Sequence, residues 1–310
     1  MSVKVLKTYN RKKNENNIVR QSNMKKIDYS IFSWIGVLGI LLRKESPWFL
    51  LLSLFFILAL VPKERELRKK EYREFYKTEF LSYFNPFFLF EILKQIIGEG
   101  ALRIYKKNNT KTKNKYILPF YGKWYVYNGG TTNENSHSWD LLSQRFAYDF
   151  VIQHDGKSFR NDKTNIHHYY SFNEPIIAAF AGKVVSINNC TDDYKKVGDY
   201  SIDWKTNNLA GNYIIIEHPN NEFSLYAHLK RNSIKVNVNE NVKQGQIIAL
   251  CGNSGRSTEP HLHFQIMDKK SLYFGKSLII RFNDVIDKNG DNVEYIEKEM
   301  EVENKTATDN

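Results

Sequence analysis

Cysteine is scarce in this sequence, which has only Cys190 and Cys251 among its 310 residues. No Cys-x-x-Cys pair is present, so the sequence indicates neither a zinc site built on thiolates nor a framework of disulfides. Cys251 ends an apolar run, and we expect it to be a small buried residue. Functions that depend on paired thiols are therefore excluded.

Long hydrophobic runs are also missing. Two apolar stretches, 29–42 and 47–61, are each shorter than the ~20 residues that a helix needs to cross the hydrocarbon core. They are nevertheless almost wholly apolar, and Trp34 and Trp48 suit the membrane–water interface. No cleavage pattern of small residues follows them. Residues 29–62 therefore predict membrane attachment by a helical hairpin, or by one span beside an interfacial segment; the alternative is two buried helices of a soluble domain.

Positive charge is in excess, with a net charge of +11 and a pI near 9.3. Much of the excess lies in the first hundred residues, beginning with a polar, basic segment at 1–28. Such a segment is typical of chain that is disordered or that lies on an anionic membrane face. The charge therefore indicates a polyanionic neighbour of the N-terminal region and says little about the rest of the chain.

Residues 63–100 predict an amphipathic helical region, which either lies on the membrane surface or packs against the protein. Pro86 should break or kink it, and Gly98-Glu99-Gly100 is expected to end it. Residues 101–115 are mostly polar and predict a linker. From 116 to 284 the pattern changes to short strands and turns without a long helix, which predicts a mainly β domain. The polar, glutamate-rich stretch 285–310 is expected to be a mobile end.

The most informative stretch runs from Gly252 to Ile266. Its first four residues, 252–255, suit a tight turn. After Pro260, three apolar residues alternate with three polar ones: Leu262, Phe264 and Ile266 against His261, His263 and Gln265. On a strand, both histidines then point to the same face. Two neighbouring imidazoles suit a metal site, in which one binds the ion and the other handles protons; the alternative is two ordinary strand histidines facing solvent.

This stretch resembles the signature of the lysostaphin-type zinc metallopeptidases, the bacterial peptidoglycan endopeptidases. The turn Gly252-Asn253-Ser254-Gly255 and the run Pro260-His261-Leu262-His263-Phe264 carry the resemblance. Earlier blocks match in order, including Ile214-Ile215-Ile216-Glu217-His218 and Leu225-Tyr226-Ala227-His228-Leu229, and the likeness covers about residues 130–270. The resemblance implies an antiparallel-sheet peptidase domain of the duplicated hybrid motif type, preceded by a helical, membrane-associated N-terminal region.

The resemblance implies a zinc ion held by two histidines and one aspartate, here His137, Asp149 and His263. The first of these departs from the pattern, because the family has a histidine four residues before the aspartate and this chain has Arg145 there. A similar subgroup takes the histidine from further upstream, which makes His137 the candidate. The alternatives are His154, His167 and His168.

By the same resemblance His228 and His261 are the catalytic pair that does not bind zinc, acting as base or acid and as stabiliser of the tetrahedral oxyanion. On its predicted strand, His228 alternates with apolar neighbours and is expected to point away from the core. Tyr226 would share its face and add a hydrogen bond to the substrate.

The leading hypothesis is a membrane-anchored zinc endopeptidase that cuts peptide bonds in peptidoglycan cross-links, with peptidoglycan peptides and the membrane as partners and no nucleic acid. Its catalytic domain would lie outside the cytoplasm, although the basic flanks of the apolar stretches both look cytoplasmic by the positive-inside rule. One alternative is a catalytically inactive copy that binds the wall or activates another hydrolase. The other is a metal-free histidine phospho-carrier module.

Overall fold

The structure is a computed structural model that describes residues 72–104 and 111–305. The chain forms two compact units, 1–64 and 65–310. The basic segment at 1–28 and the apolar stretches at 29–62 lie outside the described residues, so their predicted membrane attachment stays a prediction. Within the described part of the chain, neither helix combines the length and apolar character needed to cross a bilayer.

In the described residues, two helices precede the β domain, α5 at Arg73–Ser82 and α6 at Pro86–Ile104. The predicted break at Pro86 is confirmed, since proline fits the first turn of a helix, where no backbone N–H partner is needed. The side chain of Asn85 accepts a hydrogen bond from Phe87 N at 3.0 Å and caps the start of α6.

The predicted end of this helix at Gly98-Glu99-Gly100 is wrong, because α6 continues to Ile104. A Cβ atom at Gly98 would lie only 2.2 Å from the carbonyl oxygen of Tyr273, so glycine is there to allow close packing. The predicted linker at 101–115 is also shorter than expected. Its first residues belong to α6 and its last to a strand, and 105–110 lie outside the described residues.

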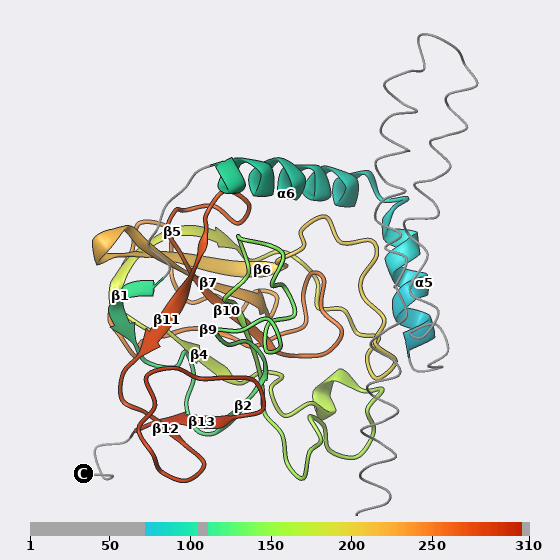
Figure 1. Ribbon diagram of the computed structural model, residues 1–310. Helices are drawn as coiled ribbons and strands as arrows, with labels where there is room; N and C mark the ends of the chain where they lie inside the picture. The colour runs from blue at the N-terminus through green and yellow to red at the C-terminus, as the bar shows by residue number, and fades with distance from the viewer. Residues whose placement is uncertain (1–71, 105–110, 306–310) are drawn as a thin grey trace, which may run out of the picture. The chain divides into compact units, whose positions relative to one another are not determined.

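Between residues 111 and 305, the second described range, the chain forms thirteen strands: β1 Lys111–Tyr116, β2 Trp124–Asn128, β3 Tyr148–Val151, β4 Pro175–Ile177, β5 Gly182–Asn188, β6 Asn212–His218, β7 Glu222–Leu229, β8 Asn241–Val242, β9 Ile247–Leu250, β10 Leu262–Met267, β11 Ser277–Phe282, β12 Val285–Asp287 and β13 Glu301–Asn304. The large sheet has the order β12-β13-β2-β3-β10-β7-β6-β5-β8, with β11 beside β10 and β1 beside β11. All its pairs are antiparallel except β1 with β11. The described domain is therefore mainly antiparallel β, as predicted (Figure 1).

The main hydrophobic core joins one face of the large sheet to the two-stranded sheet β4-β9. Phe150, Phe264 and Tyr226 contribute from β3, β10 and β7, and none of the three side chains is exposed. Burial of such side chains drives the fold, because each contributes about 2 kcal/mol when removed from water. The opposite face of the same strands carries a smaller apolar cluster and the polar residues described below.

The C-terminal stretch from 285 was expected to be a mobile end, but its described residues belong to the sheet. β12 pairs with β13, and β13 pairs with β2. The side chain of Val302 lies in the core while those of Glu301 and Glu303 are partly exposed. The alternation of buried and exposed side chains that is typical of a strand was therefore present in the sequence, and the high glutamate content concealed it.

His218 lies at the end of β6 and provides a test of the fold. Its Nδ1 is 2.9 Å from the carbonyl oxygen of Ala181, and its Nε2 is 2.7 Å from Ser224 Oγ. Burial lowers the pKa of the imidazole from 6.5 to about 4. Between pH 6.5 and 4, the unfolded chain therefore binds a proton at this residue that the folded chain does not. The contribution of His218 to stability is thus complete above pH 6.5 and falls by up to about 3 kcal/mol as the pH drops to 4.

We expect His218→Gln to flatten the dependence of the unfolding free energy on pH between 6.5 and 4. Urea unfolding of the full chain in detergent, followed by tryptophan fluorescence, measures this slope, since Trp124 is buried in the core. His167→Gln is the control, because the backbone at that position is exposed and its bond to Asn165 does not involve the ring. An unchanged slope in His218→Gln would contradict the assignment.

Candidate active site

The candidate site begins with two residues that the sheet places side by side. Asp149 on β3 and His263 on β10 are directly paired in the antiparallel ladder. Their side chains therefore emerge on the same face, opposite the core, and His263 Nδ1 lies 2.9 Å from Asp149 Oδ1. Both side chains are about 10% exposed, so this contact is nearly closed to solvent.

His137 reaches the same carboxylate from the loop between β2 and β3. Its Nδ1 lies 3.3 Å from Asp149 Oδ2, and its side chain is 40% exposed, which places it at the rim. Neighbouring bonds hold this loop: Ser136 Oγ donates to the carbonyl of Arg145 at 2.7 Å, and Arg145 Nε donates to that of Trp139 at 2.7 Å. Arg145, which occupies the position where the family has a histidine, thus braces the loop that carries His137.

The three alternative histidines have other neighbours. The ring of His154 lies against Tyr170, and that of His167 against Phe172. His168 Nδ1 contacts the carbonyl oxygen of Asp162 at 3.0 Å. Of these four histidines, His137 is the one that the structure brings to Asp149. This placement favours His137 as the ligand, and its role as a ligand stays a prediction.

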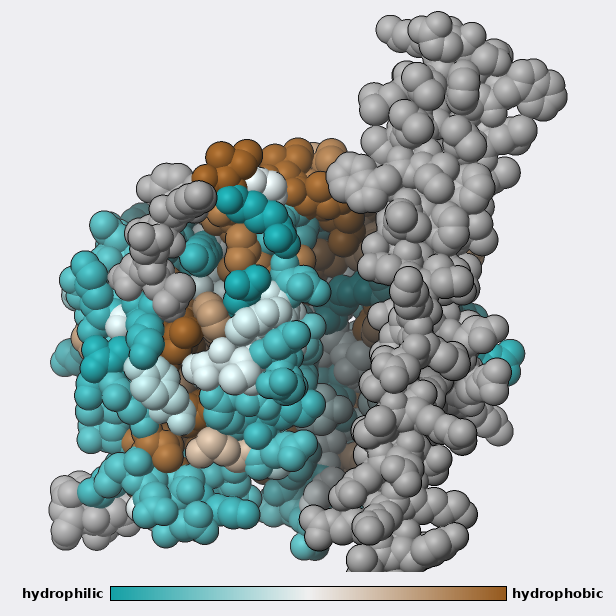
Figure 2. All heavy atoms as spheres, viewed as in Figure 1, coloured by the Kyte–Doolittle hydropathy of each residue, from teal (hydrophilic) through white to brown (hydrophobic). Residues whose placement is uncertain are grey.

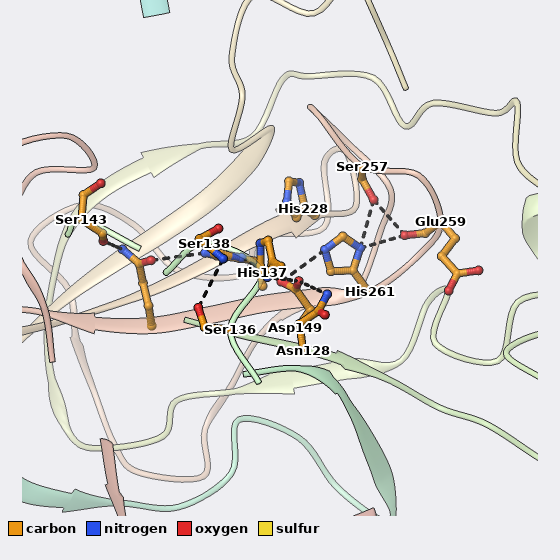
Figure 3. A network of polar contacts seen from close by, with 12 residues as sticks. Asn128, Ser136, His137, Ser138, Ser143, Asp149, His228, Ser257, Glu259 and His261 are labelled. Carbon is orange, nitrogen blue, oxygen red and sulfur yellow. Dashed lines mark hydrogen bonds and ion pairs between the residues drawn. The ribbon is translucent and has the colours of Figure 1, made fainter. Parts of the chain in front are cut away.

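His228 and His261 complete the cluster, with ring centroids 4.7 Å apart (Figure 3). His228 Nδ1 lies 2.8 Å from the carbonyl oxygen of Ser254, and His261 Nδ1 lies 2.8 Å from that of Glu259. A carbonyl only accepts, so each Nδ1 carries a proton and each Nε2 is left for other contacts. His261 Nε2 is 3.7 Å from Asp149 Oδ1.

A β-bulge turns His228 into the site. Asn212 pairs with Leu229 and Ile214 pairs with Tyr226, so two residues of β7 oppose one residue of β6. His228 has a φ of 58°, which breaks the regular alternation of side chains.

The prediction that Tyr226 shares the face of His228 and bonds the substrate is therefore wrong. Tyr226 has no exposed surface, and its hydroxyl accepts a hydrogen bond from Ala179 N at 2.8 Å within the core. Leu225 and Ala227, which were expected to point inward, line the cleft instead.

Burial and the cluster itself set the charge states. Burial alone would raise the pKa of the Asp149 carboxyl, but His137, His263 and His261 outweigh it and hold the pKa well below its ordinary value of 3.8. Burial, followed by the neighbouring rings of His261 and His263, lowers the pKa of His228 well below 6.5. At neutral pH the site therefore contains an ionised carboxylate beside a neutral imidazole.

The donor set of His137, Asp149 and His263 fits zinc, which binds imidazole nitrogen and carboxylate oxygen. Among the described residues, the ion-pair partners of the buried Asp149 carboxylate are all histidines, the residue type that binds zinc together with carboxylates. Two ligands on a tetrahedral zinc stand about 3.3 Å apart, against 2.9 and 3.3 Å here. The spacing is that of hydrogen-bonded partners, and no group of three or more His, Cys, Asp or Glu in the described chain is arranged so that it could hold a metal ion.

The cluster lies in a cleft of about 740 Å³, and the N-terminal helices form part of its wall. Phe75 and Tyr76 of α5 and Ile92 and Gln95 of α6 line it. An ion pair between Arg256 and the α5 residue Glu79 holds the first helix in place. Hydrogen bonds hold α6 in place: Glu99 accepts from Leu142 N at 2.8 Å and from Ser143 N at 2.9 Å, and Tyr273 donates to Glu91.

The sequence did not single out three polar residues that orient the cluster. Asn128 Nδ2 donates to Asp149 Oδ2 at 3.1 Å. Ser257 Oγ is 3.0 Å from His261 Nδ1. Gln265 Oε1 is 3.3 Å from His263 Nε2, so it fixes the ring with Nδ1 towards Asp149. Only Gln265 carried a signal, because it shares the alternation of His261 and His263.

Part of the chain is similar to known proteins. Residues 164–274 match the sequence profile of Peptidase family M23. Residues 164–274 are therefore similar to a family whose peptidases are zinc metallopeptidases. The matched segment includes His228, His261 and His263, whereas His137 and Asp149 precede it.

Two curated relatives illustrate the similarity. The chain is 44% identical over 61 residues to the peptidoglycan DD-endopeptidase ShyC of Vibrio cholerae, a match that covers 20% of this chain and 14% of the relative. It is 44% identical over 55 residues to the DD-carboxypeptidase/endopeptidase Mpg of Neisseria meningitidis, covering 18% and 12%. The matches thus span less than a fifth of the length of these relatives.

Among solved structures, the chain is similar to the catalytic domain of lysostaphin from Staphylococcus simulans, with 24% identity and a TM-score of 0.30, covering 51% of this chain and 88% of that one. It is also similar to a zinc-containing peptidase from Vibrio cholerae, with 23% identity and a TM-score of 0.27, covering 51% and 35%.

Proposed function

We propose that this protein is a zinc-dependent endopeptidase that hydrolyses peptide bonds in peptidoglycan cross-links. The observation that carries the proposal is the convergence of His137, His261 and His263 on the buried carboxylate of Asp149, with His228 beside the ring of His261. The M23 domain and its similarity to peptidoglycan endopeptidases support the choice of substrate.

His137, Asp149 and His263 would hold the ion through Nδ1, the carboxylate and Nδ1. When bound, zinc supplies a Lewis acid for the scissile carbonyl and lowers the pKa of water towards ~7. Gln265 keeps the His263 ring in its orientation from the other nitrogen. The low pKa of Asp149 keeps this carboxylate ionised and able to bind a cation at every pH near neutrality.

His228 and His261 would move the proton. A backbone carbonyl accepts a hydrogen bond from the Nδ1 of each ring, which leaves Nε2 as the nitrogen that can exchange a proton. Such an Nε2 accepts the proton of the attacking water, and the resulting N–H then donates to the tetrahedral oxyanion or to the departing amine. The two rings lie together on one side of Asp149, so acid, base and stabiliser act on the same bond (Figure 3).

The protein is further proposed to be held at the cell membrane by residues 29–62, with the catalytic domain on the outer side. The two apolar stretches and their interfacial tryptophans support the attachment. The location of the proposed substrate outside the cytoplasm supports the orientation.

Metal analysis of the purified full chain, together with release of soluble fragments from purified cell wall, tests the function. We expect about one zinc ion per chain and hydrolysis that a chelator stops. His137→Ala should lose both zinc and hydrolysis, because the variant removes one of three ligands. His154→Ala is the matched control and should keep both, since its ring contacts Tyr170 and not the cluster.

A chain that stays metal-free when zinc is supplied would refute the proposal. Bound zinc without wall hydrolysis would instead support the inactive, wall-binding alternative. Retention of zinc by His137→Ala, with its loss from His154→Ala, would move the first ligand to position 154.

A further inference from the structure

Helix α6 has an apolar face that turns away from the β domain. Its exposed side chains range from Leu89, 47% exposed, to Ile104, 84% exposed. The outer face consists of Leu89, Phe90, Leu93, Ile96, Ile97 and Ile104. Figure 2 shows the corresponding hydrophobic band along α6, over a largely hydrophilic domain. Monomeric soluble proteins rarely expose contiguous apolar surface of this kind, so the outer face marks an interaction site.

The charges of α6 are arranged around this face. Both acidic residues point inward: Glu91 is bonded to Tyr273, and Glu99 accepts from the backbone of Leu142 and Ser143. At 3.6 residues per turn, Lys94 and Arg103 flank the outer face on opposite sides. The result is an apolar stripe bordered on one side by Arg103 and on the other by Lys94, which forms an ion pair with Glu91 at 2.6 Å.

We propose that the outer face of α6 lies flat in the interfacial region of an anionic lipid bilayer. The helix has 19 residues and is therefore about 28 Å long, a suitable length for a helix lying in the interface plane. At one edge of the outer face, Arg103 bonds a backbone carbonyl and keeps its positive charge, which matches anionic headgroups. The upstream sequence favours lipid over a protein partner, because the apolar stretches at 29–61 and a basic run at 63–73 lead directly into α5.

The same helix links the bilayer to the cleft. On its inner side, Gln95 Nε2 donates to Ser143 Oγ at 2.8 Å, and the carbonyl of Ser143 accepts from Gln265 Nε2 at 3.1 Å. Gln265 in turn holds His263. One helix diameter, about 10 Å, therefore separates the lipid contact from the wall of the cleft. If the proposed function holds, the enzyme acts on wall peptides next to the membrane; the lipid contact itself does not depend on that function.

A fluorescent probe on α6 tests the proposal in the full chain. In a Cys190→Ser background, which removes the exposed native thiol, Ile96→Cys is labelled with an environment-sensitive dye. The protein is reconstituted into vesicles of phosphatidylethanolamine and phosphatidylglycerol. We expect brominated lipids to quench the dye and aqueous iodide to lose most of its effect. Asn289→Cys, in the exposed turn after β12, is the control and should show the reverse.

A double substitution in α6 provides a second test of the lipid contact. Leu93→Glu with Ile97→Glu places two charges on the exposed outer face without touching the core, and should expose the dye at position 96 to iodide. Leu93→Ile with Ile97→Leu keeps the face apolar and should leave the bilayer contact intact.

Iodide quenching at position 96 equal to that at position 289 would overturn the proposal. Shielding from iodide without quenching by brominated lipids would also overturn it, because a second copy or the chain's own apolar stretches would then cover the face. Neither readout requires peptidase activity, so a failure here is distinct from a failure of the proposed function.

Discussion

Asp149→Asn should remove both bound zinc and hydrolysis while leaving the domain folded. The substitution keeps the volume and one oxygen, but it removes the negative charge that three imidazoles surround. Changes in the outer shell of a metal site cost 10–100-fold in affinity or activity, so loss of a direct carboxylate ligand should cost more than about 100-fold. Zinc content after dialysis and the rate of fragment release from cell wall measure the two effects.

Asn128→Ala is the graded control for that experiment. It removes the hydrogen bond to Asp149 Oδ2 but leaves the carboxylate in place. We expect it to weaken zinc binding by about 10–100-fold, the range found for residues that orient a ligand. Full zinc occupancy in Asp149→Asn, or an equal loss in the two variants, would show that the carboxylate is not a ligand. Circular dichroism checks that each variant is folded.

Much of this site was predictable because strand alternation is a local property. The apolar residues of β10 assign His263 to the face opposite the core, and those of β3 do the same for Asp149. Direct pairing of the two in the ladder depends on strand order and register, which the alternation of side chains does not specify. His137 could be proposed only by resemblance, since a loop residue carries no periodic signal.

Several of the wrong predictions share a physical cause, because packing decided which side chains face the cleft and where α6 ends. The bulge at His228 reverses which side chains of β7 face the cleft, and nothing in the apolar pattern reveals the additional residue. Gly98 looked like the end of a helix but permits contact with Tyr273, which lies 175 positions further along the chain. The participation of α5 and α6 in the cleft likewise depends on contacts such as Arg256 with Glu79.

His261→Ala should separate metal binding from catalysis. The His261 ring shares the face of His263 but stands further from the carboxylate, with Nε2 at 3.7 Å from Asp149 Oδ1. We therefore expect this variant to keep zinc at the level of the unchanged chain. Hydrolysis should fall by about 10²–10⁴-fold, the range for removal of a group that transfers protons in the transition state.

Ser257→Ala tests whether hydrolysis depends on the ring of His261 itself or on the serine that contacts it. The serine hydroxyl lies 3.0 Å from His261 Nδ1. When that hydroxyl is removed, the carbonyl of Glu259, at 2.8 Å, still accepts a hydrogen bond from Nδ1. The hydrolysis rate of Ser257→Ala should therefore fall much less than that of His261→Ala, with zinc unchanged in both. Loss of zinc from His261→Ala would make this residue a ligand, and the proton would then have to be moved by His228, whose neutral ring lies beside it.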